Sequence, residues 1–168
     1  GRGQAEQTLR KILSRFPAFS FNVDTKIMPG IKEPRDILKP SLDRLLGGKN
    51  RNIKENNAKF DTAGNTAGNT AGETNISLDC LYLHWPKSGF DNLSFLKKMD
   101  SLKEDGTIRK LGICNIPQPL LEDFLRKGLK PDRIQIPHSL LWKRDFEEIS
   151  ALCRENNIET AIYSPTGM

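Results

Sequence analysis

Large apolar residues recur with a helical period in five segments of the chain. The first segment carries them at positions i, i+3, i+4 and i+7: Leu9, Ile12, Leu13 and Phe16. This spacing predicts an amphipathic helix. Four further segments show similar helical faces: 37–46, 95–102, 120–125 and 146–153. Pro40 lies inside the second of these, so we expect that helix either to start at Pro40 or to kink there.

Between the helical segments lie five short stretches that favour strands: 19–26, 78–84, 110–115, 133–136 and 158–163. Several are apolar on both faces, as is typical of strands buried in a parallel sheet. The order is one helix, four strand–helix units and a last strand. This order predicts an α/β fold with parallel strands and right-handed crossovers.

Two architectures fit that order, a doubly wound open sheet and a (β/α)8 TIM barrel. A Rossmann-type open sheet would carry Gly-x-Gly-x-x-Gly directly after a strand. No such motif follows any of the five predicted strands. The pattern alone therefore leaves both architectures open, although the glycine fingerprint expected of a Rossmann-type open sheet is missing after these strands.

Residues 47–75 do not belong to this pattern. Only Ile53 and Phe60 are large and apolar there, and residues 61–72 repeat a four-residue unit that ends in Thr-Ala-Gly. Such a composition cannot bury enough surface to offset the entropy lost on ordering. We predict a low-complexity, flexible surface insertion and give less weight to a lid or partner-binding loop. Subtracting its 29 residues from 168 leaves 139 to form the fold.

The composition excludes several classes of protein. The chain is 36% hydrophobic, so it is not wholly disordered, and its net charge of +5 is scattered, which disfavours nucleic acid as a partner. It has no run of about 18 apolar residues for a membrane helix, and residues 1–4 lack the hydrophobic centre of a signal peptide. The three cysteines are well separated, which predicts reduced thiols, no metal site, and a location in the cytoplasm or an organelle such as a plastid.

Polar side chains stand at or near the carboxyl ends of all five predicted strands: Lys26, His84, Asn115, Gln135 and Tyr163. Each has a simpler explanation by itself, such as a solvated lysine, a core or turn histidine, or an asparagine that caps the next helix. In a barrel, however, the carboxyl ends of the strands meet around one pocket. Their joint placement favours a shared site over five separate structural roles.

Several motifs resemble those of the aldo-keto reductases, in the family's order. Leu-Asp-Cys-Leu-Tyr-Leu-His-Trp-Pro at 78–86 resembles the strand that carries their histidine, and Gly-Thr-Ile-Arg-Lys-Leu-Gly-Ile-Cys-Asn at 106–115 resembles the next strand. Tyr-Ser-Pro at 163–165 resembles the end of the strand with their stacking tyrosine. Asp-Thr-Lys at 24–26 and Gly-Arg-Gly-Gln-Ala-Glu at 1–6 match two earlier positions. The resemblance covers the chain except 47–75.

The resemblance implies a partial TIM barrel that transfers hydride between NADP(H) and an aldehyde or ketone, with NAD(H) as the alternative cofactor. Lys26 and His84 match two residues that assist the family's catalytic tyrosine. Asn115 and Gln135 match residues that hold the nicotinamide carboxamide, and Tyr163 matches the ring that stacks on nicotinamide. Cys114 stands where serine is common, and because a thiol is a weak donor we expect a weaker carboxamide contact there.

The chain also departs from the family pattern. By alignment of motifs, the family's catalytic tyrosine and aspartate fall before Gly1, and its phosphate-binding basic residues fall after Met168. Tyr82 and Tyr163 already match other positions. Asp61-Thr62-Ala63 spells the aspartate motif, but it lies in the repeat, so we interpret it as coincidence. His138, where tyrosine is frequent, is interpreted as a loop or core residue.

The sequence thus predicts one partial barrel over residues 1–168. Five strands in 139 residues give about 28 residues per unit, and eight units would need about 220, near the roughly 250 of a whole barrel. The first hypothesis is an NADP-dependent reductase that is inactive as this truncated chain. The alternative is a non-catalytic, reductase-derived protein that binds a cofactor or a partner. A metal-dependent barrel is disfavoured, because the two histidines show no ligand spacing.

Overall fold

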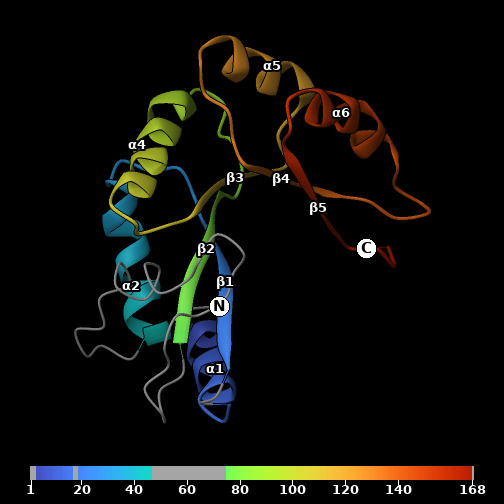
Figure 1. Cartoon of the computed structure of the whole chain (residues 1–168). Coiled ribbons are helices and arrows are strands. Elements are labelled where there is room, and N and C mark those ends of the chain that lie inside the picture. The colour runs from blue at the N-terminus through green and yellow to red at the C-terminus, as the bar shows by residue number, and fades with distance from the viewer. Residues whose placement is uncertain (1–2, 17–18, 47–74, 168) are drawn as a thin grey trace.

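A computed structural model describes residues 3–16, 19–46 and 75–167, in which strands and helices alternate (Figure 1). The strands are β1 (Ser20–Ile27), β2 (Asn75–Leu83), β3 (Lys110–Cys114), β4 (Arg133–Pro137) and β5 (Glu159–Tyr163). The helices are α1 (Gln4–Leu13), α2 (Pro34–Leu46), α4 (Asn92–Glu104), α5 (Gln118–Arg126) and α6 (Arg144–Glu155).

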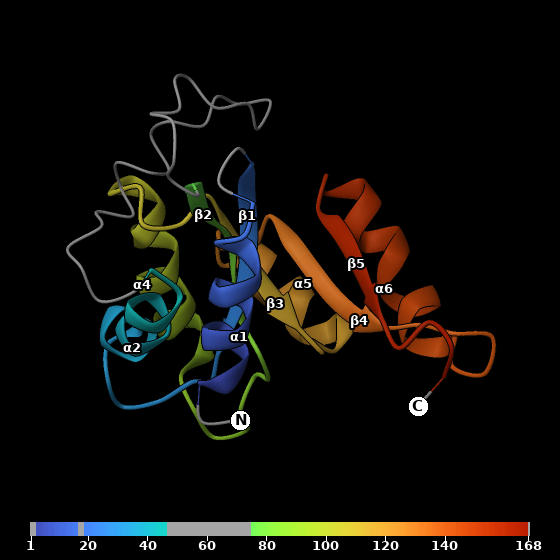
Figure 2. The same cartoon turned by 90° about the horizontal axis from the view of Figure 1, so that it is seen from below.

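The five strands form one parallel sheet in the order β1-β2-β3-β4-β5. A doubly wound sheet reverses its strand order at a switch point, whereas this order runs straight along the chain. Figures 1 and 2 show the sheet curling, with α4, α5 and α6 outside the curve. The fold is therefore part of a (β/α)8 barrel, and β1 and β5 are the two edges of the described sheet.

The convex face of the sheet packs on the helices and forms the main core. Alternate strand residues such as Leu81, Leu83 and Ile113 are buried there against Leu96, Met99, Phe124 and Ile149 from the helices. The concave face carries a separate small cluster of buried side chains: Cys80, Tyr82 and Cys114. This alternation follows from the two-residue period of a strand, which sends successive side chains to opposite faces.

An irregularity in β2 shapes the concave face. Val23 pairs with Leu78 and Thr25 pairs with Leu81, so β2 holds one residue more than β1 between these pairs. A bulge of this kind interrupts the ladder. The backbone N–H of Cys80 donates instead to Oδ1 of Asp24, at 3.1 Å.

All five predicted strands are present, and each end differs from its prediction by three residues or fewer. Of the two alternatives for Pro40, a helix start there is excluded, because α2 begins at Pro34 and Pro40 lies inside it. The predicted apolar face of the first helix is also only partly correct. α1 ends at Leu13 and packs through Leu9 and Leu13, whereas Ile12 and Phe16 are about half exposed.

The predicted insertion at 47–75 lies outside the described residues except for Asn75, which begins β2. The Asp-Thr-Ala motif at 61–63 lies outside them as well. Cys80, Cys114 and Cys153 are free thiols, and all three are buried. In the described part of the chain, no helix is both long enough and apolar enough to cross a membrane.

Candidate functional site

The structure brings the predicted site residues to one edge of the curled sheet. Lys26 is the last residue but one of β1, and Tyr163 ends β5. His84 and Asn115 directly follow β2 and β3, and Gln135 is the middle residue of β4. Because the strands are parallel, their carboxyl ends share this edge.

Tyr163, on edge strand β5, contacts residues on β1 and after β3. Its hydroxyl donates to Oδ1 of Asn115 at 2.6 Å, and the Lys26 ammonium lies 5.9 Å from the centre of its ring. That distance is within the range of a cation–π interaction. Lys26 and Tyr163 belong to opposite edge strands, so the curl of the sheet is what brings them together.

Asn115 forms hydrogen bonds with the residues on either side of it, His84 and Gln135. Its side-chain amide donates to the carbonyl oxygen of His84 at 3.3 Å, and its backbone N–H donates to the carbonyl oxygen of Gln135 at 2.9 Å. Asn115 adopts a left-handed conformation with φ of 54°. Asparagine tolerates this conformation better than most residues. The turn directs the chain away from the sheet and leaves the side chain among its neighbours.

Cys114 and Gln135 form a second contact on the concave face. The Cys114 thiol donates to Oε1 of Gln135 at a long 3.5 Å. Burial raises the pKa of Cys114 to about 11, although nearby Lys26 acts in the opposite direction. The thiol therefore keeps its proton and remains a weak donor. Among the described residues, nothing accepts a hydrogen bond from the Gln135 side-chain amide, so its N–H groups are available to a ligand.

The surroundings at the carboxyl ends of the strands favour a neutral His84 beside the positively charged Lys26. Burial, with a further contribution from Lys26, lowers the pKa of His84 below its ordinary value of 6.5. Burial raises the pKa of Tyr163. The Lys26 side chain is exposed, and within the described ranges no carboxylate pairs with it. The site thus holds one uncompensated positive charge.

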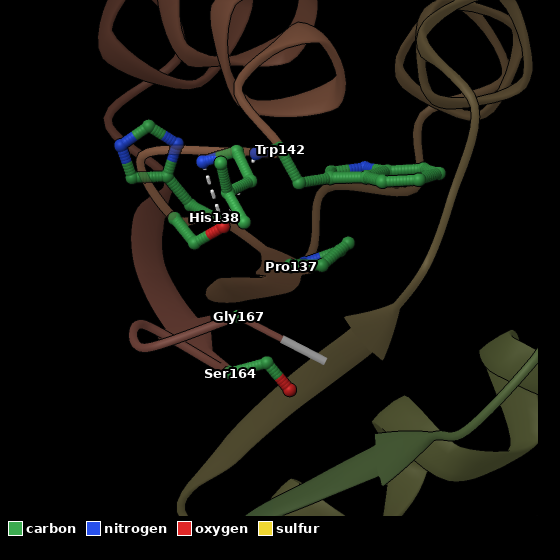
Figure 3. A pocket seen from close by; sticks show the side chains of 7 residues that line it. Pro137, His138, Trp142, Ser164 and Gly167 are labelled. Carbon is green, nitrogen blue, oxygen red and sulfur yellow. Dashed lines mark hydrogen bonds between the residues drawn. The ribbon is translucent and has the colours of Figure 1, made fainter.

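Two hollows border this group of residues. A groove of about 530 Å³ lies between α1, α2 and β1, and both Lys26 and His84 line it. A pocket of about 190 Å³ lies at the carboxyl ends of β4 and β5 (Figure 3). It is lined by Pro137, His138, Ser139, Leu141, Trp142, Ser164 and Gly167.

Sequence reasoning missed most of this pocket, because its residues lie in loops without periodicity. Ser139 organises one loop: its hydroxyl accepts from the backbone N–H groups of Leu141 and Trp142, at 3.2 and 3.1 Å. Ser164 follows Tyr163 with a left-handed φ of 54°, unusual for serine. The adjoining Tyr-Ser-Pro motif was the one available signal for this side of the site.

The His138 ring packs on a helix that covers the sheet. Its ring centroid lies 4.4 Å from that of Phe146 in α6. Its Nδ1 atom is buried and finds no hydrogen-bond partner within the described part of the chain. No group of three or more His, Cys, Asp or Glu side chains there has the arrangement of a metal site.

The donor set fits a flat aromatic ring that carries an amide. Gln135 offers amide donors, Asn115 offers a second carboxamide, and Tyr163 offers an aromatic face beside a cation. An amide group needs both donors and acceptors, and an aromatic ring needs an apolar face to stack on. These are the requirements of a nicotinamide ring.

Comparisons with known proteins show to which family the chain belongs. The family model described as Aldo/keto reductase family matches residues 1–168. The NADH-specific methylglyoxal reductase of Escherichia coli (strain K12) is 34% identical over 67 residues, which are 40% of this chain and 20% of that protein. Methylglyoxal reductase DkgA of Yersinia pestis is 33% identical over 91 residues, 52% of this chain and 32% of that protein. The chain spans a third or less of these curated relatives.

Solved structures show the same fold. An aldo/keto reductase from Brucella melitensis matches with a TM-score of 0.68 at 18% identity, over 97% of this chain and 55% of that one. An aldo-keto reductase from Klebsiella pneumoniae, in complex with NADPH, matches with a TM-score of 0.69 at 17% identity, over 96% and 48%. The family model covers the whole chain and the strand order is that of a partial barrel, so the chain belongs to the aldo/keto reductase family.

Proposed function

We propose that this chain forms the nicotinamide-binding part of an NADP(H)-dependent carbonyl reductase site, and that it turns over little substrate as these 168 residues. The observation that carries the proposal is the contact between opposite edges of the sheet. Tyr163 is fixed by its 2.6 Å hydrogen bond to Asn115, and Lys26 lies over its ring. A fixed aromatic ring beside free amide donors is a suitable support for nicotinamide.

The chain's own residues have separate roles in this proposal. Tyr163 covers one face of the cofactor ring, and the amides of Gln135 and Asn115 orient its carboxamide. The cofactor supplies the hydride, which no side chain can supply. The neutral His84 imidazole hydrogen-bonds the substrate carbonyl oxygen. The unpaired Lys26 charge stabilises negative charge that develops there.

The low turnover follows from the two tyrosines. Tyr82 is buried, its hydroxyl lies 3.4 Å from Nη1 of Arg133, and burial raises its pKa. The Tyr163 hydroxyl already donates a hydrogen bond to Oδ1 of Asn115, and burial raises the pKa of Tyr163 as well. A proton donor needs the opposite shift of pKa and access to the substrate. Without it, the chain forgoes acid catalysis worth about 10²–10⁴-fold in rate.

The comparisons support the class of ligands. The Klebsiella pneumoniae neighbour was solved with NADPH, which favours NADP(H), whereas the Escherichia coli relative is NADH-specific, which makes NAD(H) the alternative. Two relatives are methylglyoxal reductases, so we propose a small aldehyde or ketone as substrate. The buried free thiols favour a reducing compartment such as the cytoplasm.

Fluorescence titration with NADPH tests the binding. We expect saturable binding by the purified chain, weakened about tenfold by Asn115→Ala, because two hydrogen bonds that fix the site are lost. Asn156→Ala is the matched control, since the Asn156 side-chain amide donates to the carbonyl oxygen of Leu152 at the end of α6, away from the site. The absence of saturable binding to NADPH and to NADH contradicts the proposal.

A turnover assay with methylglyoxal and NADPH tests the low-turnover part of the proposal, whereas the effect of Asn115→Ala on NADPH binding separates the two functional hypotheses. We expect this chain to bind NADPH but to reduce methylglyoxal no faster than the background rate. Robust reduction would show that the chain supplies its own proton donor and would overturn the low-turnover part of the proposal. A non-catalytic interaction protein, the second candidate, would show neither turnover nor weakening of NADPH binding by Asn115→Ala.

A further inference from the structure

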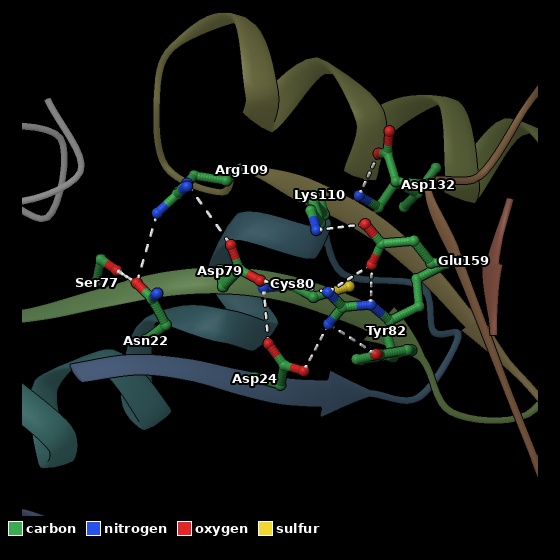
Figure 4. A network of polar contacts seen from close by, with 12 residues as sticks. Asn22, Asp24, Ser77, Asp79, Cys80, Tyr82, Arg109, Lys110, Asp132 and Glu159 are labelled. Atoms are coloured by element: carbon green, nitrogen blue, oxygen red, sulfur yellow. Dashed lines mark hydrogen bonds and ion pairs between the residues drawn. The ribbon is translucent and has the colours of Figure 1, made fainter. Parts of the chain in front are cut away.

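A cluster of charged side chains spans the concave face on the amino-terminal side of the site (Figure 4). At its centre is Arg133, the first residue of β4, whose side chain is 18% exposed. Its guanidinium contacts groups from three other strands. It lies 3.0 Å from Asp24 in β1, 3.6 Å from Asp79 in β2 and 2.7 Å from Glu159 in β5.

The contact between Arg133 and Asp24 reflects the curl of the sheet. β1 and β4 are separated by two strands, which in a flat sheet would place them about 14 Å apart with side chains standing parallel. A 3.0 Å contact between their side chains therefore requires the curved sheet. Arg133 joins β1 and β5, the two edges of the described sheet.

The cluster is balanced in charge and saturated with contacts. The three carboxylates of Asp24, Asp79 and Glu159 face three cations, since Lys110 lies 2.8 Å from Glu159 and Arg109 lies 3.6 Å from Asp79. Nη1 of Arg133 also donates to the hydroxyl of buried Tyr82, at 3.4 Å. A group with its charges paired in this way has no spare capacity for a ligand. Its geometry instead suits a connection between strands.

Both edge strands carry this connection to the functional edge. Asp24 lies two residues before Lys26 on β1, and Glu159 begins the strand that Tyr163 ends. A strand is stiff over so short a distance, so the spacing of Asp24 and Glu159 determines the spacing of Lys26 and Tyr163. The 5.9 Å contact between that ammonium and that ring depends on it.

We infer that Arg133 is a positioning residue, which clamps the edge strands β1 and β5 across the concave face and so holds Lys26 beside Tyr163. The functional half of this inference rests on the proposed nicotinamide site. The structural part of the inference, that Arg133 fixes the distance between β1 and β5, does not depend on the proposed function.

Distance measurement between two spin labels tests the clamp directly. Met28 follows β1 and Ile162 lies in β5, and both are about half exposed, so each is replaced by cysteine and labelled. The native cysteines are buried and do not compete for the label. We expect one narrow distance distribution in the parent protein and a longer, broader one after Arg133→Met.

Arg144→Met is the matched control, because Arg144 is exposed and pairs only with Glu148 of its own helix. It removes the same charge and should leave the distance unchanged. Glu159→Gln, a milder change at a side chain that is 53% exposed, should lengthen the distance less than Arg133→Met. It keeps the test decisive if Arg133→Met does not fold, as judged by circular dichroism.

NADPH affinity is the second measurement. Displacement of a positioned group by an ångström is costly, so we expect Arg133→Met to weaken NADPH binding on the order of tenfold or more and Arg144→Met to leave it unchanged. An unchanged label distance in folded Arg133→Met and in Glu159→Gln overturns the clamp. If the parent protein does not bind NADPH but the distance still responds to Arg133, the clamp stands and the proposed function falls.

Discussion

His84 shows how one residue's surroundings decide its chemistry. It lies directly after β2, close to Lys26, and it is partly buried. Removal from water and a neighbouring positive charge both disfavour the imidazolium form. The neutral ring that results can accept a hydrogen bond at one nitrogen and donate one at the other. This is the state that the proposed role at a carbonyl oxygen needs.

The titration of His84 is therefore a specific prediction. We expect its pKa to lie below 6.5 and to rise part of the way back in Lys26→Met, because burial remains as the main cause. Histidine proton and carbon shifts in NMR follow the titration, and His138→Gln assigns the two histidines. A midpoint at or above 6.5 in the parent protein would show that the ring is not disfavoured as a cation.

The same shift of pKa has a consequence for stability. A base whose pKa is lowered on folding binds fewer protons in the folded than in the unfolded state. The protein therefore loses stability as the pH falls below the unfolded pKa of 6.5. This loss continues until the pH reaches the lower pKa of the folded state. His84→Gln should reduce the difference between urea midpoints measured at pH 7.5 and pH 5.5.

Among the elements, β2 and β3 are in unusually close contact on the concave face. The ring of Tyr82 in β2 lies against Gly112 of β3, its partner in the register. A Cβ atom on Gly112 would come within 2.3 Å of that ring. The glycine is therefore required by space and not by its backbone angles.

We expect Gly112→Ala to destabilise the protein by about 1–3 kcal/mol, the usual cost of overpacking a core. Denaturation in urea measures the change. Combining Gly112→Ala with Tyr82→Leu removes the clash, so the alanine should cost much less in that background. An equal cost in both backgrounds would mean that the ring is not what excludes the Cβ atom.

Strands and helices were predictable here where the apolar period is regular. The five strands were all identified, because alternating helical and strand patterns occupy separate segments. Phe16 was assigned wrongly to a helix face because periodicity does not show where a helix ends; α1 ends at Leu13. Pro40 left two alternatives open for a related reason, since a proline in a helical pattern does not show whether the helix starts there or began earlier.

At the scale of the whole molecule, the curl of the sheet brings Lys26 of β1 close to Tyr163 of β5 at the candidate site. The site residues were proposed from motifs at or near strand ends; Lys26, His84, Asn115 and Tyr163 lie at the carboxyl ends of their strands, whereas Gln135 lies in the middle of β4, and their functional roles remain a prediction. The Arg133 cluster was not predicted, because Asp24, Asp79, Arg133 and Glu159 are far apart in the sequence. Only the register and curvature of the strands bring such charges together, and no local pattern marks them.

The open edges of the described sheet are a second feature of the whole molecule. β1 and β5 each pair on one side only, and Ile162 of β5 is about half exposed. Unpaired strand edges favour association between chains. We expect this chain to self-associate with rising concentration, and Ile162→Lys to reduce that association in sedimentation velocity.

Ile31→Lys is the control for this prediction, because Ile31 is exposed in the loop after β1, outside both edge strands. It adds the same charge and should leave the association unchanged. Strictly monomeric behaviour of the parent chain at high concentration would contradict the prediction.

The central claim is that nicotinamide stacks on Tyr163, and NMR can observe this contact directly. Nuclear Overhauser effects between bound NADPH and the tyrosine ring protons suffice, since the chain has only Tyr82 and Tyr163 and a Tyr163→Leu variant assigns them. We predict cross-peaks from the nicotinamide ring protons to Tyr163 and none to buried Tyr82. Saturable binding without any cross-peak to Tyr163 would contradict the account.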